Sequence, residues 1–251
     1  MTSQKVSKTR DLNKEYQDSE DRKYAYDFDY LLRDYMLQTF APFLRRGRAL
    51  ELGCYKGEFT KKLRPHFEDI TVIEGASDLI QEARKNVGSQ VRFLEGTFEA
   101  IELKEEFDAI FLIHTLEHLD DPLLVLKRIN YWLSSDGKLF LVVPNANAPS
   151  RQIAVRMGLI PHHAAVTEGE AAHGHRTTYS LDTLERDARL AGLKILHRGG
   201  IFFKPFANFQ FDRLMQAKIV DKAYLDGCYK LGMIYPDLCA SIYVVCERGG
   251  R

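Results

Sequence analysis

The residues best suited to chemistry in this sequence form a turn that follows a short apolar run. The run spans 48–52, and the turn contains Glu51, Gly53, Cys54 and Gly57 before a helical pattern begins. Glycines at such a position let a ligand approach the backbone at the carboxyl end of a strand, where a doubly wound sheet has its binding crevice. An ordinary strand-to-helix turn has similar residues, so the turn by itself does not identify the ligand.

An acidic residue ends the next apolar run. Glu74 follows Gly53 by 21 residues, the spacing at which a carboxylate accepts hydrogen bonds from both hydroxyls of a ribose. The turn lacks the third glycine of the GxGxxG fingerprint, and Glu58 lies near the helix N-terminus, where it would repel a pyrophosphate. A ligand without phosphates therefore fits better than NAD, and an NAD-dependent short-chain oxidoreductase is the rival enzyme class.

Histidines gather at two places that a catalytic base could occupy. His114 and His118 follow the fourth apolar run, and half of the eight histidines lie between 162 and 175. Imidazole takes up a proton near neutral pH, so His118, His173 and His175 are the predicted catalytic residues. The alternatives are a packing element at a helix start for His118 and a solvated loop for the other two.

The histidine-rich loop raises two further possibilities. A metal site is the less favoured, because its histidines lack paired-helix spacing such as HExxH, so no metal is expected. Arg176 and Tyr179 follow the loop directly. Because a guanidinium forks onto a carboxylate or phosphate, the two residues are predicted to hold an anionic or hydroxylated substrate. A purely structural role for both is the alternative.

A parallel sheet would bring these separated side chains together. Short apolar runs alternate with helical patterns along the first half of the chain, which predicts βαβ units. The expected strands are 48–52, 70–74, 91–95, 107–113, 137–143, 194–203 and 240–246. Around them we expect a mobile arm at 1–21, a capping helix at 22–45, a cofactor-binding core at 46–145, a lid at 146–179 and a helical insertion at 205–236.

Composition limits the classes of function. With 251 residues and 45% hydrophobic content, the chain can bury one full core, so a single domain is expected. Lys plus Arg equal Asp plus Glu at 35 each, which removes the electrostatic support for nucleic-acid or membrane binding. No apolar stretch has the length of a membrane span, and four cysteines without a CxxC pair indicate free thiols in a reducing cytoplasm.

Five successive segments resemble the motifs of class I S-adenosylmethionine-dependent methyltransferases. They are ALELGCYKGEFT, TVIEGAS, FLEGTFEAI, FDAIFLIHTLEHLDDP and GKLFLVVPN, which together cover about residues 48–145. The resemblance implies an α/β fold with a doubly wound, seven-stranded, mostly parallel sheet, an N-terminal capping helix and a lid insertion. It also implies an enzyme whose cofactor is S-adenosylmethionine.

The resemblance further implies roles for single residues. In that family the glycine turn passes the methionyl part of the cofactor, the acid after the second strand binds ribose, and residues after the third strand flank adenine. In this sequence the resemblance implies that the methionyl part is contacted by Glu51, Gly53, Cys54, Gly57 and the backbone of His114. It implies that the ribose is bound by Glu74, Gly75 and Ala76, and that the adenine is flanked by Thr97 and Phe98. In the leading helix, Tyr24 is expected to touch the cofactor and Tyr26 the substrate.

The methyl acceptor is expected to be a small molecule. MGLI, the histidine-rich run and GHRTTYSLDTL are similar to segments of methyltransferases from sugar, cell-surface polysaccharide and secondary-metabolite pathways. We therefore expect methyl transfer to an oxygen or nitrogen of a small bacterial metabolite. Oxygen is preferred because a lid histidine could remove a hydroxyl proton. A non-catalytic cofactor-binding protein is the other alternative, and a homodimer remains open.

Overall fold

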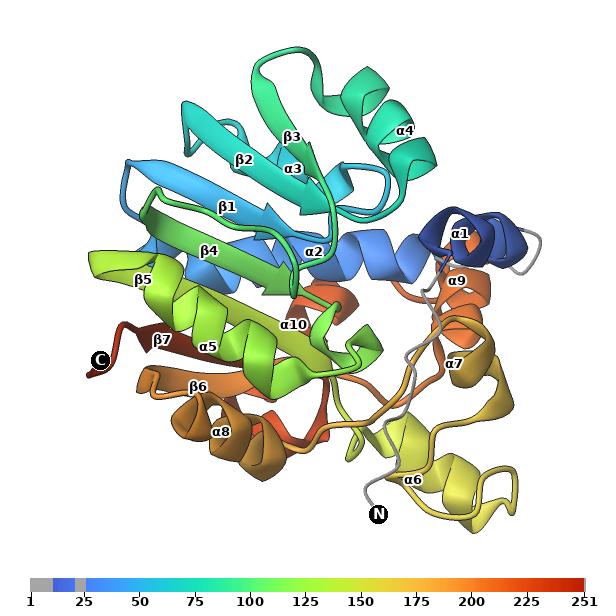
Figure 1. Ribbon diagram of the computed structural model, residues 1–251. Coiled ribbons are helices and arrows are strands. Elements are labelled where there is room, and N and C mark those ends of the chain that lie inside the picture. Colours follow the sequence, from blue (N-terminus) through green and yellow to red (C-terminus); the bar gives the residue numbers. More distant parts are fainter. Residues whose placement is uncertain (1–10, 21–25, 251) are drawn as a thin grey trace, which may run out of the picture.

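A seven-stranded sheet forms the centre of the molecule (Figure 1). The computed structural model describes residues 11–20 and 26–250. The strand order is β3-β2-β1-β4-β5-β7-β6, and only β7 runs antiparallel to its neighbours. This arrangement confirms the doubly wound, mostly parallel sheet expected from the sequence. The strands are β1 (Arg48–Leu52), β2 (Asp69–Glu74), β3 (Val91–Glu95), β4 (Phe107–Ile113), β5 (Leu133–Pro144), β6 (Lys194–Phe203) and β7 (Cys239–Glu247).

The chain direction across the sheet reverses between β1 and β4. From β1 the chain continues to β2 and β3 on one side, and it then returns to place β4 and β5 on the other. In an open α/β sheet, the carboxyl ends of strands at such a reversal leave a crevice for a ligand. The loops that follow β1, β2 and β4 carry most of the residues singled out above, so the topology brings them to one edge.

Helices cover both faces of the sheet and bury two apolar cores (Figure 1). In the parallel strands β1 and β2, nearly every residue is buried, because side chains on both faces meet a helix layer. In one core, Phe111 and Phe140 stack with ring centroids 4.8 Å apart. That face is covered by α2 (Asp27–Phe40), α3 (Glu58–Leu63), α4 (Ser77–Val87), α9 (Asn208–Gln216) and α10 (Lys222–Ile234), and the other by α5 (Pro122–Trp132) and α8 (Leu181–Leu190).

The N-terminal segment differs from the expected mobile arm. Residues 12–20 form α1 (Leu12–Glu20), which packs on α4. The side-chain amide of Asn13 donates to Ser77 Oγ over 3.0 Å and accepts from the backbone N–H of Asp78 over 3.2 Å. Tyr16 is 8% exposed. The arm prediction is therefore wrong for these residues, because a mostly polar helix with one buried aromatic side chain lacks a clear amphipathic pattern.

The expected capping helix is part of the sheet's cover. Helix α2 begins at Asp27 and ends at Phe40, and a short 3₁₀ turn, η1 (Ala41–Phe43), follows it. The buried positions Phe28, Leu32 and Phe40 belong to the core on that face. The first half of α2 also lines the crevice. Tyr24 lies outside the described residues.

The lid region contains two short helices, α6 (Pro149–Arg156) and α7 (Glu168–Ala172). The guanidinium of Arg151 forms an ion pair with Glu170, which joins the two helices. Where the lid returns to the sheet, the backbone N–H of Arg176 donates to the carbonyl oxygen of Glu117 over 2.8 Å. The lid is therefore tied to η2 (Leu116–His118), the 3₁₀ turn after β4. A third such turn, η3 (Pro236–Leu238), precedes β7.

Within the described residues, no helix has the length and apolarity to cross a membrane.

Candidate active site

A cavity of about 710 Å³ lies at the carboxyl ends of β1, β2 and β4. This volume is within the usual range for a site that holds a cofactor or another small molecule. Its wall includes residues of α1, α2, the turns after β1 and β2, η2 and the lid. The residues predicted from the sequence that line it are Glu51, Gly53, Cys54, Glu74, Gly75, Ala76, Thr97, Phe98, His114, His118, His173, His175 and Tyr26.

The turn after β1 depends on Gly53. Its φ is +76°, and a Cβ atom there would lie 2.8 Å from Thr115 Oγ1. Only glycine adopts this conformation at so close an approach without strain. The Gly53 N–H donates to the carbonyl oxygen of Ile73 over 2.9 Å, which fixes the turn against the end of β2.

Gly57 does not line the cavity, contrary to the role carried over from the family resemblance. It precedes α3 with a φ of +82°, and a Cβ atom there would lie 3.0 Å from Val87 and 3.2 Å from Ala83 of α4. The glycine is needed for a left-handed turn and for close packing of two helices. The glycine turn therefore contains one residue that faces the ligand space and one that positions the helix behind it.

Glu74 connects the two loops at the edge of the sheet. One of its oxygens accepts from the backbone N–H of Gly75 over 2.8 Å and of Ala76 over 3.2 Å, and the other accepts from the N–H of Cys54 over 3.2 Å. These bonds hold the carboxyl group in one orientation at the wall of the cavity. Burial raises its pKa, and hydrogen bonds from the backbone of Ala76, Gly75, Cys54 and Tyr55 oppose that effect.

Glu51 is a second buried acid on this wall. It is 1% exposed, and its carboxylate accepts from Thr60 Oγ1 over 2.6 Å. Burial raises its pKa to about 7, while the Thr60 hydroxyl and the charge of Arg33 lower it. Arg33, on α2, also lines the cavity, and its Nη1 is buried without a hydrogen-bond partner among the described residues. No motif in the sequence marks Arg33, because nothing along the chain relates α2 to the end of β1.

The first turn of α1 closes the cavity beside β2. A Cβ atom on Gly75 would lie 2.2 Å from Leu12 Cδ1, so the glycine permits α1 to approach. The ring of Tyr16 lies edge-on to that of Tyr55, with centroids 6.3 Å apart. Phe98, which is largely buried, and Thr97 line the same cavity. The apolar side chains of Leu12 and Phe98 and the ring of Tyr16 give it a surface suited to a flat ring.

His114 is a neutral, fixed part of the wall. Its backbone N–H donates to Val142 O over 2.9 Å, which continues the β4–β5 pairing, and its Nε2 shares a hydrogen bond of 2.8 Å with Ser241 Oγ. Burial first, and then the nearby charge of Arg33, lower its pKa to about 3. Its ring is thus uncharged at neutral pH and oriented by the neighbouring strand β7.

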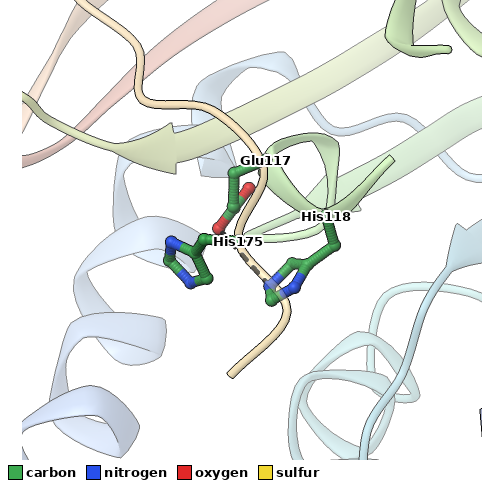
Figure 2. A group of neighbouring side chains, drawn as sticks. All are labelled: Glu117, His118 and His175. Carbon is green, nitrogen blue, oxygen red and sulfur yellow. Dashed lines mark ion pairs between the residues drawn. The ribbon is translucent and has the colours of Figure 1, made fainter. Parts of the chain in front are cut away.

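Three side chains from two distant segments meet under the lid (Figure 2). Glu117 and His118 come from η2, and His175 comes from the end of the lid. The imidazole centroids of His118 and His175 are 4.6 Å apart, and His118 Nε2 is 4.0 Å from Glu117 Oε1. The structure therefore brings two of the three predicted catalytic histidines together. His173 lines the same cavity at the end of α7.

Glu117 is the least expected member of this group, because its position in a run of charged residues resembles a solvated surface. It is 2% exposed, and neither carboxyl oxygen has a hydrogen-bond partner among the described residues. Burial raises its pKa to about 8. Burial also lowers the pKa of His175, which favours its uncharged form.

Arg176 and Tyr179 do not line the cavity, so the structural alternative describes them better than a substrate contact. The guanidinium of Arg176 is 2.8 Å from an oxygen of Asp120, and its Nε donates to the carbonyl oxygen of His118 over 3.3 Å. The ring of Tyr179 is buried in the core between α5 and α8. The backbone of Tyr179 also accepts from the N–H of Ala146, which closes the base of the lid.

A polar extension of the cavity lies behind the lid. This smaller space of about 100 Å³ shares Glu117, His175, Glu170 and Lys204 with the large cavity. Burial lowers the pKa of Lys204, and its ammonium forms no ion pair with a residue in the described part of the chain. Lys204 follows β6, far along the chain from the motifs, and no sequence signal marked it.

Comparisons with known proteins agree with this geometry. The family model described as "Methyltransferase domain" matches residues 24–198, more than half of the chain. A ubiquinone biosynthesis O-methyltransferase of Xanthomonas axonopodis is 26% identical over 166 residues, which cover 64% of this chain and 68% of the relative.

Solved structures show the same fold. A methyltransferase of Thermotoga maritima, described as a possible histamine N-methyltransferase, has a TM-score of 0.63 at 19% identity, covering 93% of this chain and 99% of its own. The N-methyltransferase NodS of Bradyrhizobium japonicum, solved with S-adenosyl-L-homocysteine, has a TM-score of 0.56 at 16% identity, covering 94% and 99%. With a reversal-point cavity suited to a nucleoside without phosphates and a matching family model, the chain belongs to the methyltransferase-domain family and is an S-adenosylmethionine-dependent enzyme.

Proposed function

We propose that the protein transfers a methyl group from S-adenosylmethionine to a hydroxyl oxygen of a small molecule bound under the lid. The observation that carries this proposal is the group of Glu117, His118 and His175 on the wall of the cofactor cavity. Removal of a hydroxyl proton is what an oxygen acceptor requires and an uncharged amine does not. The similarity to ubiquinone biosynthesis O-methyltransferases supports the same choice.

The residues of the cavity suit the charges of the cofactor. The amino-acid end of S-adenosylmethionine has one ammonium and one carboxylate group. Glu51 provides a buried acid, and the unpartnered Nη1 of Arg33 provides a cation close enough to influence it. We propose that Glu51 and Arg33 bind the two groups, with Gly53, Cys54 and the backbone of His114 alongside. The pairing of opposite charges in a buried site satisfies both side chains.

The nucleoside end is assigned from the other loops. Glu74 lies at the wall with its carboxyl group fixed by backbone donors, and we propose that it accepts from the ribose hydroxyls, with Gly75 and Ala76 beside it. Thr97 and Phe98 would flank the adenine ring, and Tyr16 of α1 would cover it. The absence of a third glycine and the acid Glu58 at the start of α3 disfavour a pyrophosphate.

Methyl transfer requires alignment, exclusion of water and removal of one proton. The bound cofactor supplies an electrophilic methyl group. The lid covers the cavity. The ion pair of Arg151 with Glu170 joins its two helices, and the backbone N–H of Arg176 ties it to η2. The group at Glu117, His118 and His175 would remove the proton from the acceptor hydroxyl. The oxygen then bonds to the methyl carbon as the bond from that carbon to the sulfonium sulfur breaks and S-adenosyl-L-homocysteine leaves. His173 is next to this space and is the other predicted base.

The polar extension of the cavity suggests which chemical group of the acceptor binds there. Lys204 faces both cavities without an ion-pair partner in the described part of the chain, so we propose that it binds an electronegative substituent of the acceptor, such as a carboxylate. Tyr26 would contact the acceptor from α2.

The cysteines Cys54, Cys228, Cys239 and Cys246 are free and buried, which supports a location in the reducing cytoplasm. A homodimer remains a prediction.

The test is direct. The purified protein is incubated with S-adenosylmethionine and a panel of hydroxylated small molecules, with and without a carboxylate, and products are identified by mass spectrometry and NMR. We expect methyl ethers, with carboxylated acceptors preferred. A methylated amine as the best product would contradict the oxygen assignment. Tight cofactor binding without product on any acceptor would favour the non-catalytic alternative.

A further inference from the structure

The group under the lid has the donor atoms of a metal site. One ligand atom each from Glu117, His118 and His175 lies within 4.8 Å of the others (Figure 2). Two imidazoles and one carboxylate are a donor set that binds divalent transition metals in proteins. Such a set leaves coordination positions open for water or a substrate atom. The spacing along the chain hid it, because His175 comes from the far end of the lid.

The side chains of the group are close but do not satisfy one another. Glu117 and His118 are 4.0 Å apart at their nearest charged atoms, which is too long for a hydrogen bond, and the two imidazoles meet edge to face at 77°. Arg151 and Arg176, the nearby guanidinium groups, pair instead with Glu170 and Asp120. Neither guanidinium group donates to the carboxyl oxygens of Glu117.

Glu117 provides the independent observation. Both of its oxygens are buried without a hydrogen-bond partner among the described residues, in a side chain that is 2% exposed. Leaving a carboxyl group in this state costs several kcal/mol if it is charged, and native structures rarely keep such groups without a partner. A cation between Glu117 and the imidazoles would supply the missing partner.

We propose that Glu117, His118 and His175 bind one divalent transition-metal ion, such as Zn²⁺, Mn²⁺ or Fe²⁺, whose open positions face the cavity. Imidazole ligands favour these ions over Mg²⁺, which prefers oxygen ligands. Resting on the proposed function, we further propose that the ion binds the acceptor hydroxyl. A bound metal lowers the pKa of a coordinated hydroxyl, so its O–H bond breaks and the proton passes to water. The oxygen then bonds to the methyl carbon while the carbon–sulfur bond of the cofactor breaks, and S-adenosyl-L-homocysteine leaves. The histidines then act as metal ligands.

The first experiment measures metal binding without turnover. The protein is stripped with a chelator and dialysed against Zn²⁺, Mn²⁺, Co²⁺ or Mg²⁺ singly, and metal content is measured by mass spectrometry. We expect one transition-metal ion per chain, little Mg²⁺, and visible absorption bands from the Co²⁺ form. Glu117→Gln, His118→Ala and His175→Ala should each weaken binding by at least the roughly 10- to 100-fold loss typical of changes in the outer shell of a metal site.

His162→Ala is the matched control, because His162 is an exposed lid histidine outside the group. It should bind metal like the wild type. Affinity for S-adenosyl-L-homocysteine, measured in every variant, reports whether the fold is kept. Wild-type protein that binds the nucleoside but no stoichiometric metal would overturn the proposal and leave the proposed function intact. Wild-type metal affinity in Glu117→Gln and His175→Ala would overturn it as well.

The second experiment tests the role of the ion in turnover on an acceptor found with the panel. Chelator-treated enzyme should lose activity and regain it with Zn²⁺, Mn²⁺ or Fe²⁺. Full activity in a preparation shown to be free of metal would contradict the catalytic part. Failure of the proposed function would look different, since no acceptor would then be methylated with or without metal.

Discussion

The two halves of the cavity are built in different ways. The cofactor half lies at the ends of β1 and β2, where Glu74 accepts from three backbone N–H groups and Gly53 is fixed against β2. The acceptor half joins η2 to the lid, and it contains Glu117 without a hydrogen-bond partner among the described residues. The loops of the cofactor half are therefore fixed by backbone hydrogen bonds before a ligand arrives, and Arg33 keeps one buried N–H for the cofactor. The half closed by the lid instead keeps a whole carboxyl group for its ligand to satisfy.

The difference predicts that changes in the acceptor half affect turnover and leave cofactor affinity unchanged. His175→Ala should give the largest effect, a loss of turnover of roughly 100- to 10,000-fold, because a base or a metal ligand is removed from the reacting end. Steady-state kinetics and calorimetry with S-adenosyl-L-homocysteine measure the two quantities. His162→Ala is the control and should keep both. A His175→Ala enzyme with the wild-type rate would remove the acceptor half from the chemistry.

In the cofactor half, Glu51 should make the stability of the protein depend on pH. Glu51 has a folded-state pKa of about 7, raised by burial from an ordinary value of 4.5. Between pH 4.5 and 7 Glu51 is protonated in the folded chain and ionised in the unfolded chain. Its contribution to the free energy of unfolding is therefore greatest below pH 4.5 and falls as the pH rises to 7. Glu51 should contribute roughly 3 kcal/mol to this loss, and Glu51→Gln should reduce the loss by that amount. The part that remains in the variant comes from Glu117 and Glu74, because burial raises the pKa of these acids too.

Urea unfolding of the cofactor-free protein across this pH range measures the effect. Glu68→Gln is a suitable control, because Glu68 is an exposed acid outside the cavity. It should follow the wild type. If wild type and Glu51→Gln lost stability in parallel, Glu51 would have an ordinary pKa and the cofactor half would be more hydrated than its burial indicates.

Sequence and structure agree best where contacts are local or a motif marks the strand ends. The bounds of β1, β3, β4 and β6 match the expected runs, and Gly53 and Glu74 line the cavity. The strand β5 begins at Leu133, earlier than expected. The sequence did not predict this first part, because the polar residues from Ser134 to Asp136 interrupt the apolar pattern.

Residues that depend on distant contacts could not be found in this way. Glu117 resembles a solvated acid until His175, 58 positions later, closes over it. Arg33 and Lys204 reach the cavity from α2 and from the end of β6, with no motif at either place. Arg176 is the opposite case. Its position beside the histidines predicted a substrate contact, but its guanidinium pairs with Asp120. Spacing along a chain reports neighbours within a motif but not the side of the lid on which a side chain lies.

A smaller effect tests the cofactor half by affinity. Glu74→Ala should weaken binding of S-adenosyl-L-homocysteine by roughly 1 to 3 kcal/mol, the range for removing a hydrogen-bonding charged group. Turnover at saturating cofactor should fall much less than in His175→Ala. Calorimetry on folded variant protein, with Glu68→Ala as control, gives the comparison. Unchanged affinity would remove the ribose assignment.

The smallest effect is expected at Arg176, outside both halves. Its ion pair with Asp120 is 2.8 Å long, but the two side chains are 41% and 57% exposed, so solvent screens it and Arg176→Ala should cost less than about 1 kcal/mol of stability. The KM for the acceptor should change little, because Arg176 does not line the cavity and its guanidinium is paired with Asp120 and the carbonyl oxygen of His118. Arg176→Lys, which keeps the charge but not the fork, should resemble wild type. A large rise in KM for Arg176→Ala, with stability and cofactor affinity kept, would mean that the lid opens in solution and turns Arg176 toward the acceptor. The closed contact between the lid and η2 would then describe only one state of the acceptor half, while the cofactor half would remain as fixed as its backbone hydrogen bonds imply.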